Sequence, residues 1–142
     1  MPHPGAVLPE VAVTIEVTEA DLASRLATIG TGGGPAGDRF PRVLATARLI
    51  SLMELASSRA MQPILGEEEM SVGVGVRVEH TAPTPLGGTV RLTARYLGTE
   101  GKFHRFEVVA HDDAGEVFRG QHTRAVITAA RLEQGAARRL RR

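Results

Sequence analysis

One carboxylate stands out in the segment ATARLISLMELASSRAM, residues 45–61. Successive residues of a helix are turned by about 100°, so on a helix Glu54 lies beside Ile50, Met61 and Leu65, at the border of the apolar face. The positions three and four residues away hold no cation, and no salt bridge within the helix is available. A boundary acid that reaches water fits this pattern. A partly desolvated carboxylate, suited to general-base or nucleophilic chemistry, fits it as well.

A second reactive side chain, His80, ends the alternating run VGVGVRVEH (72–80). The run predicts a strand with four valines on one face: Val72, Val74, Val76 and Val78. By parity His80 points to the same side, toward the helix. The next residues, HTAPTPLGG (80–88), break the strand and leave His80 at a rim. A structural histidine and an acid–base catalyst both fit this place. Gly73 and Gly75 indicate either the close approach of a ligand or a bulge.

The elements that must position these residues follow from hydrophobic periodicity. EVAVTIEV (10–17) alternates strictly and predicts a half-buried strand. TEAD (18–21) has the pattern of a capping box and predicts a short helix ending near Gly30, ahead of the flexible glycine-rich loop 30–38. The long helix follows over about residues 45–65. Its central apolar stripe is formed by Leu49, Met53, Ala56, Ala60 and Ile64.

After the long helix the pattern changes to period two. Strands are predicted over 72–80, 89–97, 103–111 and 116–129, separated in part by the turns GTEGK and DDAG. One long helix packed in a curled antiparallel sheet of about five strands is the hot-dog arrangement, an α+β fold. A ferredoxin-like sandwich would need a second helix between the later strands, and the pattern predicts none there.

Length and composition limit the classes of function. The chain has 142 residues, 42% of them hydrophobic, which suits a single domain over residues 1–142. Its net charge of +1 does not indicate a nucleic-acid partner or a membrane surface. No cysteine is present, which excludes disulfides and thiolate chemistry. No stretch is apolar enough for a membrane helix. We therefore expect a cytoplasmic protein without a bound metal, in which the basic segment 131–142 is a solvated tail.

Three segments of the chain resemble hot-dog thioesterases of the fluoroacetyl-CoA thioesterase type: FPRVLATARLISLMELASSRAM, VGVRVEHTAPTPLGGTV and HTRAVI. The resemblance covers about residues 10–130. Its most specific part is a helical Thr and Glu separated by seven residues, followed by HTAPTP on a strand. It implies hydrolysis of acyl-CoA thioesters, with CoA as part of the substrate and no other cofactor. The residues it implies are catalytic Thr46, Glu54 and His80, and substrate-binding Phe40 and Gly73.

The resemblance also implies a mechanism and an assembly. Glu54 would attack the thioester carbonyl or activate water, His80 would be its acid–base partner, and Thr46 would orient one of them or bind the carbonyl. A backbone N–H near Gly73 would stabilise the oxyanion. In a continuous helix, however, Thr46 and Glu54 lie ~12 Å apart along the axis. Either the helix begins after Thr46, or the groups meet through substrate or a dimer partner. We expect a side-by-side homodimer with its sites at the subunit interface.

Two classes of function remain for comparison with the structure. The first is an acyl-CoA thioesterase acting on a short or medium acyl chain. The second is a non-catalytic protein of the same fold that binds or senses acyl-CoA. The presence of all three polar positions favours the enzyme. Arg124, in HTRAVI, is either a structural residue or a contact for the CoA phosphates.

Overall fold

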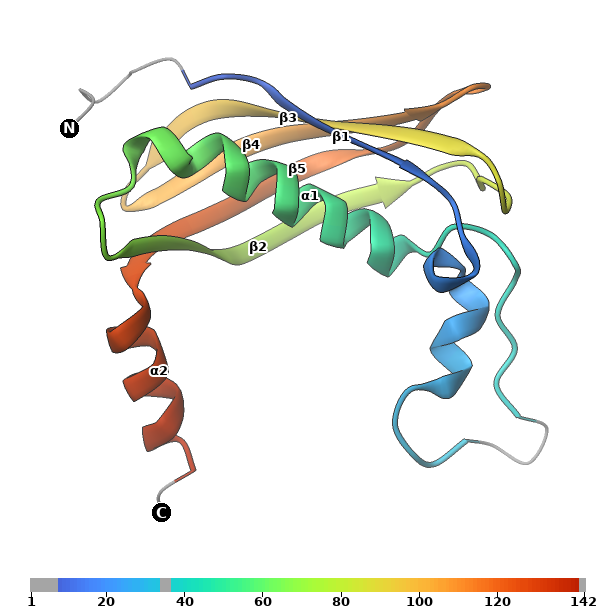
Figure 1. Cartoon of the computed structure of the whole chain (residues 1–142), viewed down its shortest axis with the longest axis horizontal. Coiled ribbons are helices and arrows are strands. Elements are labelled where there is room, and N and C mark those ends of the chain that lie inside the picture. Colours follow the sequence, from blue (N-terminus) through green and yellow to red (C-terminus); the bar gives the residue numbers. More distant parts are fainter. Residues whose placement is uncertain (1–7, 34–36, 141–142) are drawn as a thin grey trace.

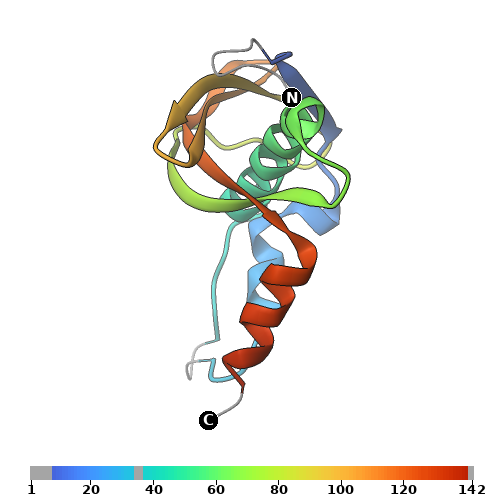
Figure 2. The same cartoon turned by 90° about the vertical axis from the view of Figure 1, so that its left-hand side faces the viewer.

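A computed structural model describes residues 8–33 and 37–140 of the chain. Five strands form one antiparallel sheet in the order β1-β3-β4-β5-β2. The sheet curls around the long helix α1 (Figures 1 and 2), which is the hot-dog arrangement expected from the sequence. The strands are β1 Val11–Glu16, β2 Glu69–His80, β3 Thr89–Glu100, β4 Phe103–Asp112 and β5 Gly115–Thr128.

Helix α1, Thr46–Met61, supplies the inner layer of the core. The predicted stripe is confirmed for Leu49, Met53, Ala56 and Ala60, which are fully buried, whereas Ile64 lies beyond α1 and is partly buried. They pack in one cluster with the buried side chains of β3 and its neighbours in the sheet. A 3-10 turn, Gln62–Ile64, follows directly and contains Pro63, which has no N–H to continue the α-helical hydrogen bonds. The side of α1 that is not packed in the core includes Glu54 and faces β2 and solvent.

Strand β2 carries a bulge that corrects the predicted parity. Its register against β5 shifts between Gly73 and Gly75. Before the shift Gly73 lies opposite the buried Arg124, and after it His80 lies opposite the buried Phe118. Since directly paired residues share a face, Gly73 and His80 both face the helix although they are an odd number of residues apart. The alternation had predicted that the four valines share one face. Because of the bulge, they do not.

The segment between β1 and α1 holds two 3-10 helices, η1 Glu19–Asp21 and η2 Ala23–Thr28, where one short helix was predicted. The Thr18 N–H and hydroxyl both donate to Oδ2 of Asp21, at 2.8 and 3.0 Å. The residues of the predicted capping box therefore do meet. Of the predicted glycine-rich loop 30–38, residues 34–36 lie outside the described residues.

The predicted basic tail is instead a helix through most of its length. Helix α2, Ala129–Arg138, follows β5 without a break, and the hydroxyl of Thr128 accepts a hydrogen bond from the Arg131 N–H at 3.3 Å. No residue of α2 is buried, so the segment is solvated as expected. Among the helices of the described residues, none combines the length and apolar character needed to cross a bilayer.

Candidate active site

Thr46 and His80 meet where α1 begins and β2 ends. The Ala45 N–H donates to the Asp21 carbonyl at 2.9 Å, which fixes the chain just before the helix. Thr46 is the first helical residue, and its Oγ1 lies 2.8 Å from Nδ1 of His80. The ring of His80 also stacks edge-on against Phe118, with ring centroids 6.4 Å apart. These contacts hold the imidazole in one orientation.

The other ring nitrogen of His80 is unusual. Nε2 is buried and has no hydrogen-bond partner within the described part of the chain. A buried polar atom without a partner costs about 1–3 kcal/mol, and such atoms in native structures call for an explanation. A hollow of about 210 Å³ lies beside the ring, lined by His80, Thr81, Ala82 and Pro83. Nε2 is thus a ring nitrogen without a partner among the described residues, in a side chain that borders a hollow.

Glu54 lies further along α1, over the bulge of β2. Its Oε1 is 3.7 Å from Nη1 of Arg124, so the carboxylate does have a cationic neighbour, supplied by β5 rather than by the helix. The side chain of Glu54 is 49% exposed, while that of Arg124 is only 6% exposed. A Cβ on Gly73 would collide with Oε1 of Glu54. Glycine at this position therefore gives the carboxylate its space.

Arg124 is a buried anchor beneath Glu54. Its Nε donates to the Ser71 hydroxyl at 2.8 Å and its Nη2 to the Ser71 carbonyl at 2.9 Å. Burial lowers the pKa of Arg124, and the Glu54 carboxylate opposes that shift. Of the two interpretations of Arg124 left open by the sequence, these contacts favour the structural one. The residue is structural in this protomer, and its guanidinium is turned away from solvent.

His122 completes the group around Glu54. A carbonyl oxygen can only accept, so Nδ1 of His122 donates to the Gly75 carbonyl at 2.7 Å. Nε2 then carries the lone pair and accepts from Nη1 of Arg124 at 3.0 Å. Burial lowers the pKa of His122, the guanidinium of Arg124 lowers it further, and the Gly75 carbonyl and Glu54 oppose the shift. The ring is thus a neutral acceptor that supports Arg124.

The predicted site residues fall into two groups within one protomer. Thr46 and His80 are in contact, and Gly73 and Glu54 are in contact. Thr46 and Glu54 are eight residues apart on a continuous helix, about 12 Å along its axis. Phe40 lies in the segment before α1 and is 42% exposed. The roles assigned to these five residues remain predictions.

Sequence reasoning missed Ser71 and His122 as partners of Arg124. The contact between Ser71 and Arg124 joins residues 53 positions apart, and no local pattern announces such a pairing. One signal was available. His122 and Arg124 are two residues apart on a predicted strand, so they share a face. The strand predicted over residues 72–80 carries two glycines, which leave space for large side chains on a neighbouring strand.

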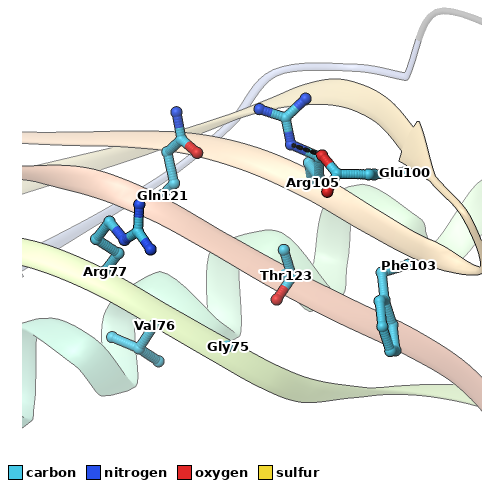
Figure 3. Close-up of a pocket in the computed structure, with 8 residues that line it drawn as sticks. All are labelled: Gly75, Val76, Arg77, Glu100, Phe103, Arg105, Gln121 and Thr123. Atoms are coloured by element: carbon cyan, nitrogen blue, oxygen red, sulfur yellow. Dashed lines mark ion pairs between the residues drawn. The ribbon is translucent and has the colours of Figure 1, made fainter.

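A further hollow lies on the other side of the sheet. It measures about 390 Å³, and its lining includes Arg77, Arg105, Phe103 and Thr123. Figure 3 shows these side chains on the strand faces that point away from α1. Arg105 lies 3.6 Å from Glu100. Because the hydrogen-bonded sheet separates this hollow from Glu54 and His80, it is not part of the candidate site.

Comparison with known proteins agrees with this architecture. The solved structure of the fluoroacetyl-CoA thioesterase FlK superposes with a TM-score of 0.83 at 34% identity, covering 94% of this chain and 96% of that one. A hypothetical protein of Thermus thermophilus, described as a thioesterase superfamily member, superposes with a TM-score of 0.78 at 26% identity, covering 98% and 95% of the two chains. The fold is therefore that of the hot-dog thioesterases.

The sequence comparison is more specific. The fluoroacetyl-CoA thioesterase of Streptantibioticus cattleyicolor is 47% identical over 88 residues, which span 62% of this chain and 63% of that protein, just under two thirds of its length. A family model described as fluoroacetyl-CoA-specific thioesterase matches residues 17–130. The chain belongs to this thioesterase family, as its motifs had indicated.

Proposed function

We propose that the protein is an acyl-CoA thioesterase, which hydrolyses a short or medium acyl-CoA thioester to the free acid and CoA. Membership of the thioesterase family supports this activity. The relative from Streptantibioticus cattleyicolor is named for fluoroacetyl-CoA, which makes fluoroacetyl-CoA and acetyl-CoA the first pair of substrates to compare. We further propose a cytoplasmic location, where CoA thioesters are formed and used, and no cofactor other than the CoA of the substrate.

The observation that carries the proposal is the state of His80. Its Nδ1 is held by the Thr46 hydroxyl, while its Nε2 is buried without a partner among the described residues. A general acid or base needs one nitrogen that is oriented and one that is available to the substrate. A thioester in the adjoining hollow supplies the missing partner, either a carbonyl oxygen or the departing sulfur.

A homodimer brings the two groups of site residues together. β2 is an edge strand, and its free edge is flanked by exposed Met70, Val74 and Val76, which favours pairing with another strand. Antiparallel pairing of two β2 strands carries the Gly73 half of one strand toward the His80 half of the other. In this arrangement Glu54 of one protomer works with Thr46 and His80 of its partner. The large axial separation within one helix then presents no difficulty.

The chemistry is balanced with water as the second substrate. In one route, Glu54 removes a proton from a water molecule while that water attacks the thioester carbon. In the other, the Glu54 carboxylate attacks the thioester carbon and forms an anhydride, which water then cleaves. In either route the carbon–sulfur bond breaks and the sulfur leaves with a proton from His80. A backbone N–H near Gly73 stabilises the oxyanion. Arg124 keeps the Glu54 carboxylate in place.

The test replaces Glu54 with glutamine and follows release of the free thiol from fluoroacetyl-CoA and acetyl-CoA. Loss of a general base or nucleophile lowers turnover by about 10²–10⁴-fold, while the fold is retained. Glu79→Gln, an exposed neighbour of His80 on β2, is the matched control and keeps its activity. Undiminished turnover by the Glu54→Gln variant would refute the assignment. Binding of acyl-CoA by the unaltered protein without thiol release would favour the sensor instead.

A further inference from the structure

Two segments project from the body of the molecule on the same side. Figures 1 and 2 show α2 extending from one end of the sheet and the η1–η2 segment from the other. Along α2 and the turn that follows it, an apolar stripe is exposed to solvent: Leu132, Ala136 and, in the turn, Leu140, with Leu132 38% and Leu140 88% exposed. Contiguous exposed apolar surface on a projecting helix indicates a binding partner.

The η1–η2 segment carries a matching hollow. About 170 Å³ of space lies between this segment and the first turns of α1. Its lining is mainly aliphatic and includes Leu22, Leu26, Ile29, Ala45 and Ala47. Ile29 is 70% exposed, so a partner that covered it would remove apolar surface from water. The lining also includes the charged Asp21, Arg25 and Arg48, and its aliphatic part suits the apolar stripe of a helix.

The strand register connects the two features. Thr128, the residue before α2, pairs with Glu69, so α2 begins at the Glu69 end of β2. The η1–η2 segment lies at the opposite end, because Asp21 binds Ala45 and the next residue, Thr46, binds His80. Antiparallel pairing of two β2 strands places the Glu69 end of one beside the His80 end of the other. The α2 of each protomer therefore faces the η1–η2 segment of its partner.

We propose that the α2 stripe of each protomer seats in the η1–η2 hollow of a second copy of the chain. The proposal rests on the β2-paired dimer of the proposed function and adds two symmetry-related contacts to it. Each contact supports the η1–η2 segment, whose Asp21 pairs with Arg48 of α1 at 2.9 Å and accepts a hydrogen bond from Ala45, the residue before Thr46. The partner's helix thus braces the segment that positions the Thr46–His80 pair, and the site is complete only in the dimer.

The chain contains no cysteine, which allows a direct test by cross-linking. Ile29→Cys and Leu132→Cys are introduced together and the protein is treated with a short bis-maleimide. We expect a covalent dimer on a denaturing gel. The matched control pairs Ile29→Cys with Gln134→Cys, on the opposite face of α2, and yields several-fold less dimer. A 29–132 cross-link confined to single chains, or equal yields from both pairs, would overturn the proposal.

A second pair of variants separates the brace from the dimer itself. Leu132→Glu and Gln134→Glu add the same charge to opposite faces of α2. We expect only Leu132→Glu to raise the amide exchange rate over residues 22–29, by tenfold or more, and to speed subunit exchange. Sedimentation gives the oligomeric state in parallel. If the Leu132→Glu variant is a dimer with an unchanged amide exchange rate over residues 22–29, the brace is refuted and the dimer remains. If the parent protein is a monomer, both are refuted.

Discussion

Gly73 is the residue at which the absence of a side chain matters most for the proposed site. A Cβ there would collide with Oε1 of Glu54, the movable end of a flexible side chain. The same Cβ would lie 3.1 Å from Cε1 of His122, so Gly73→Ala displaces the carboxylate and also requires a small shift of the His122 ring. We expect turnover to fall by about 10²-fold, the cost of a misplacement near 1 Å, while the free energy of unfolding changes little. Thiol release and urea unfolding measure the two effects.

Gly75 provides the control for that prediction. A Cβ on Gly75 would collide with the Thr123 hydroxyl, on the face of the sheet turned away from Glu54. Gly75→Ala is thus a change of the same size two residues along the same strand. It should leave turnover within a factor of two or three. Equal losses in both variants would mean that the bulge, and not the space for Glu54, determines activity.

His122 makes the stability of the protein depend on pH. Burial holds the pKa of His122 below its ordinary value of 6.5, and burial shifts the pKa of His104 in the same direction. Between the folded and the unfolded pKa the unfolded chain binds more protons, so the free energy of unfolding rises with pH there. This contribution is complete above pH 6.5 and is lost as the pH falls below it.

Replacing the histidine tests that assignment. In urea unfolding between about pH 5 and 6.5, His122→Gln should show a smaller rise of the free energy of unfolding with pH than the parent protein. His111→Gln, an exposed histidine on β4, is the control and should keep the parental slope. The carboxyl groups whose pKa values are lowered, such as Asp112, act at lower pH. An unaltered slope in His122→Gln would contradict the prediction.

At the scale of elements, α1 links the core to the site. Met53 is fully buried against the sheet, whereas Glu54, the next residue, faces β2 and solvent. Met53→Ala should lower the free energy of unfolding by about 2–5 kcal/mol, because it removes buried methylene groups and leaves a cavity. Arg59→Ala, an exposed change on the same helix, should cost less than about 0.5 kcal/mol. Denaturant unfolding measures both, and similar losses would contradict the packing.

The elements were largely predictable because periodicity reports burial. The stripe from Leu49 to Ala60 and the alternation of β1 and β3 identified the faces that the structure buries. The bulge was not predictable, since one extra residue leaves the alternation of letters intact while it reverses the face of every later side chain. Gly73 and Gly75 were compatible with a bulge, but they did not indicate at which residue the pairing register shifts.

The site could be predicted only in part for a related reason. Thr46, Glu54 and His80 were found from motif and polarity, and the contact between Thr46 and His80 is present. The buried support of Glu54 was not foreseen. Arg124, His122 and Ser71 are brought together by strand pairing over long sequence distances, and pairing register is a property of the folded sheet. Motifs therefore gave the reactive groups, and the fold gave the residues that hold them.

At the scale of the whole molecule, the proposed dimer makes a prediction that no single chain can satisfy. Glu54→Gln and His80→Asn are each expected to be inactive. When the two proteins are mixed and allowed to exchange subunits, half of the dimers become mixed. Each mixed dimer holds one site with both Glu54 and His80 intact, so about a quarter of all sites are restored.

Turnover in the mixture should accordingly rise to about a quarter of the parental rate, at a rate set by subunit exchange. Mixing Glu54→Gln with the parent protein is the control, because half of all sites keep both Glu54 and His80 before and after exchange and its activity should stay constant. A mixture that exchanges fully but stays inactive would place Glu54 and His80 of one protomer in the same site. Since ~12 Å of helix separates Glu54 from Thr46, which holds His80, that result would require α1 to deform when substrate binds.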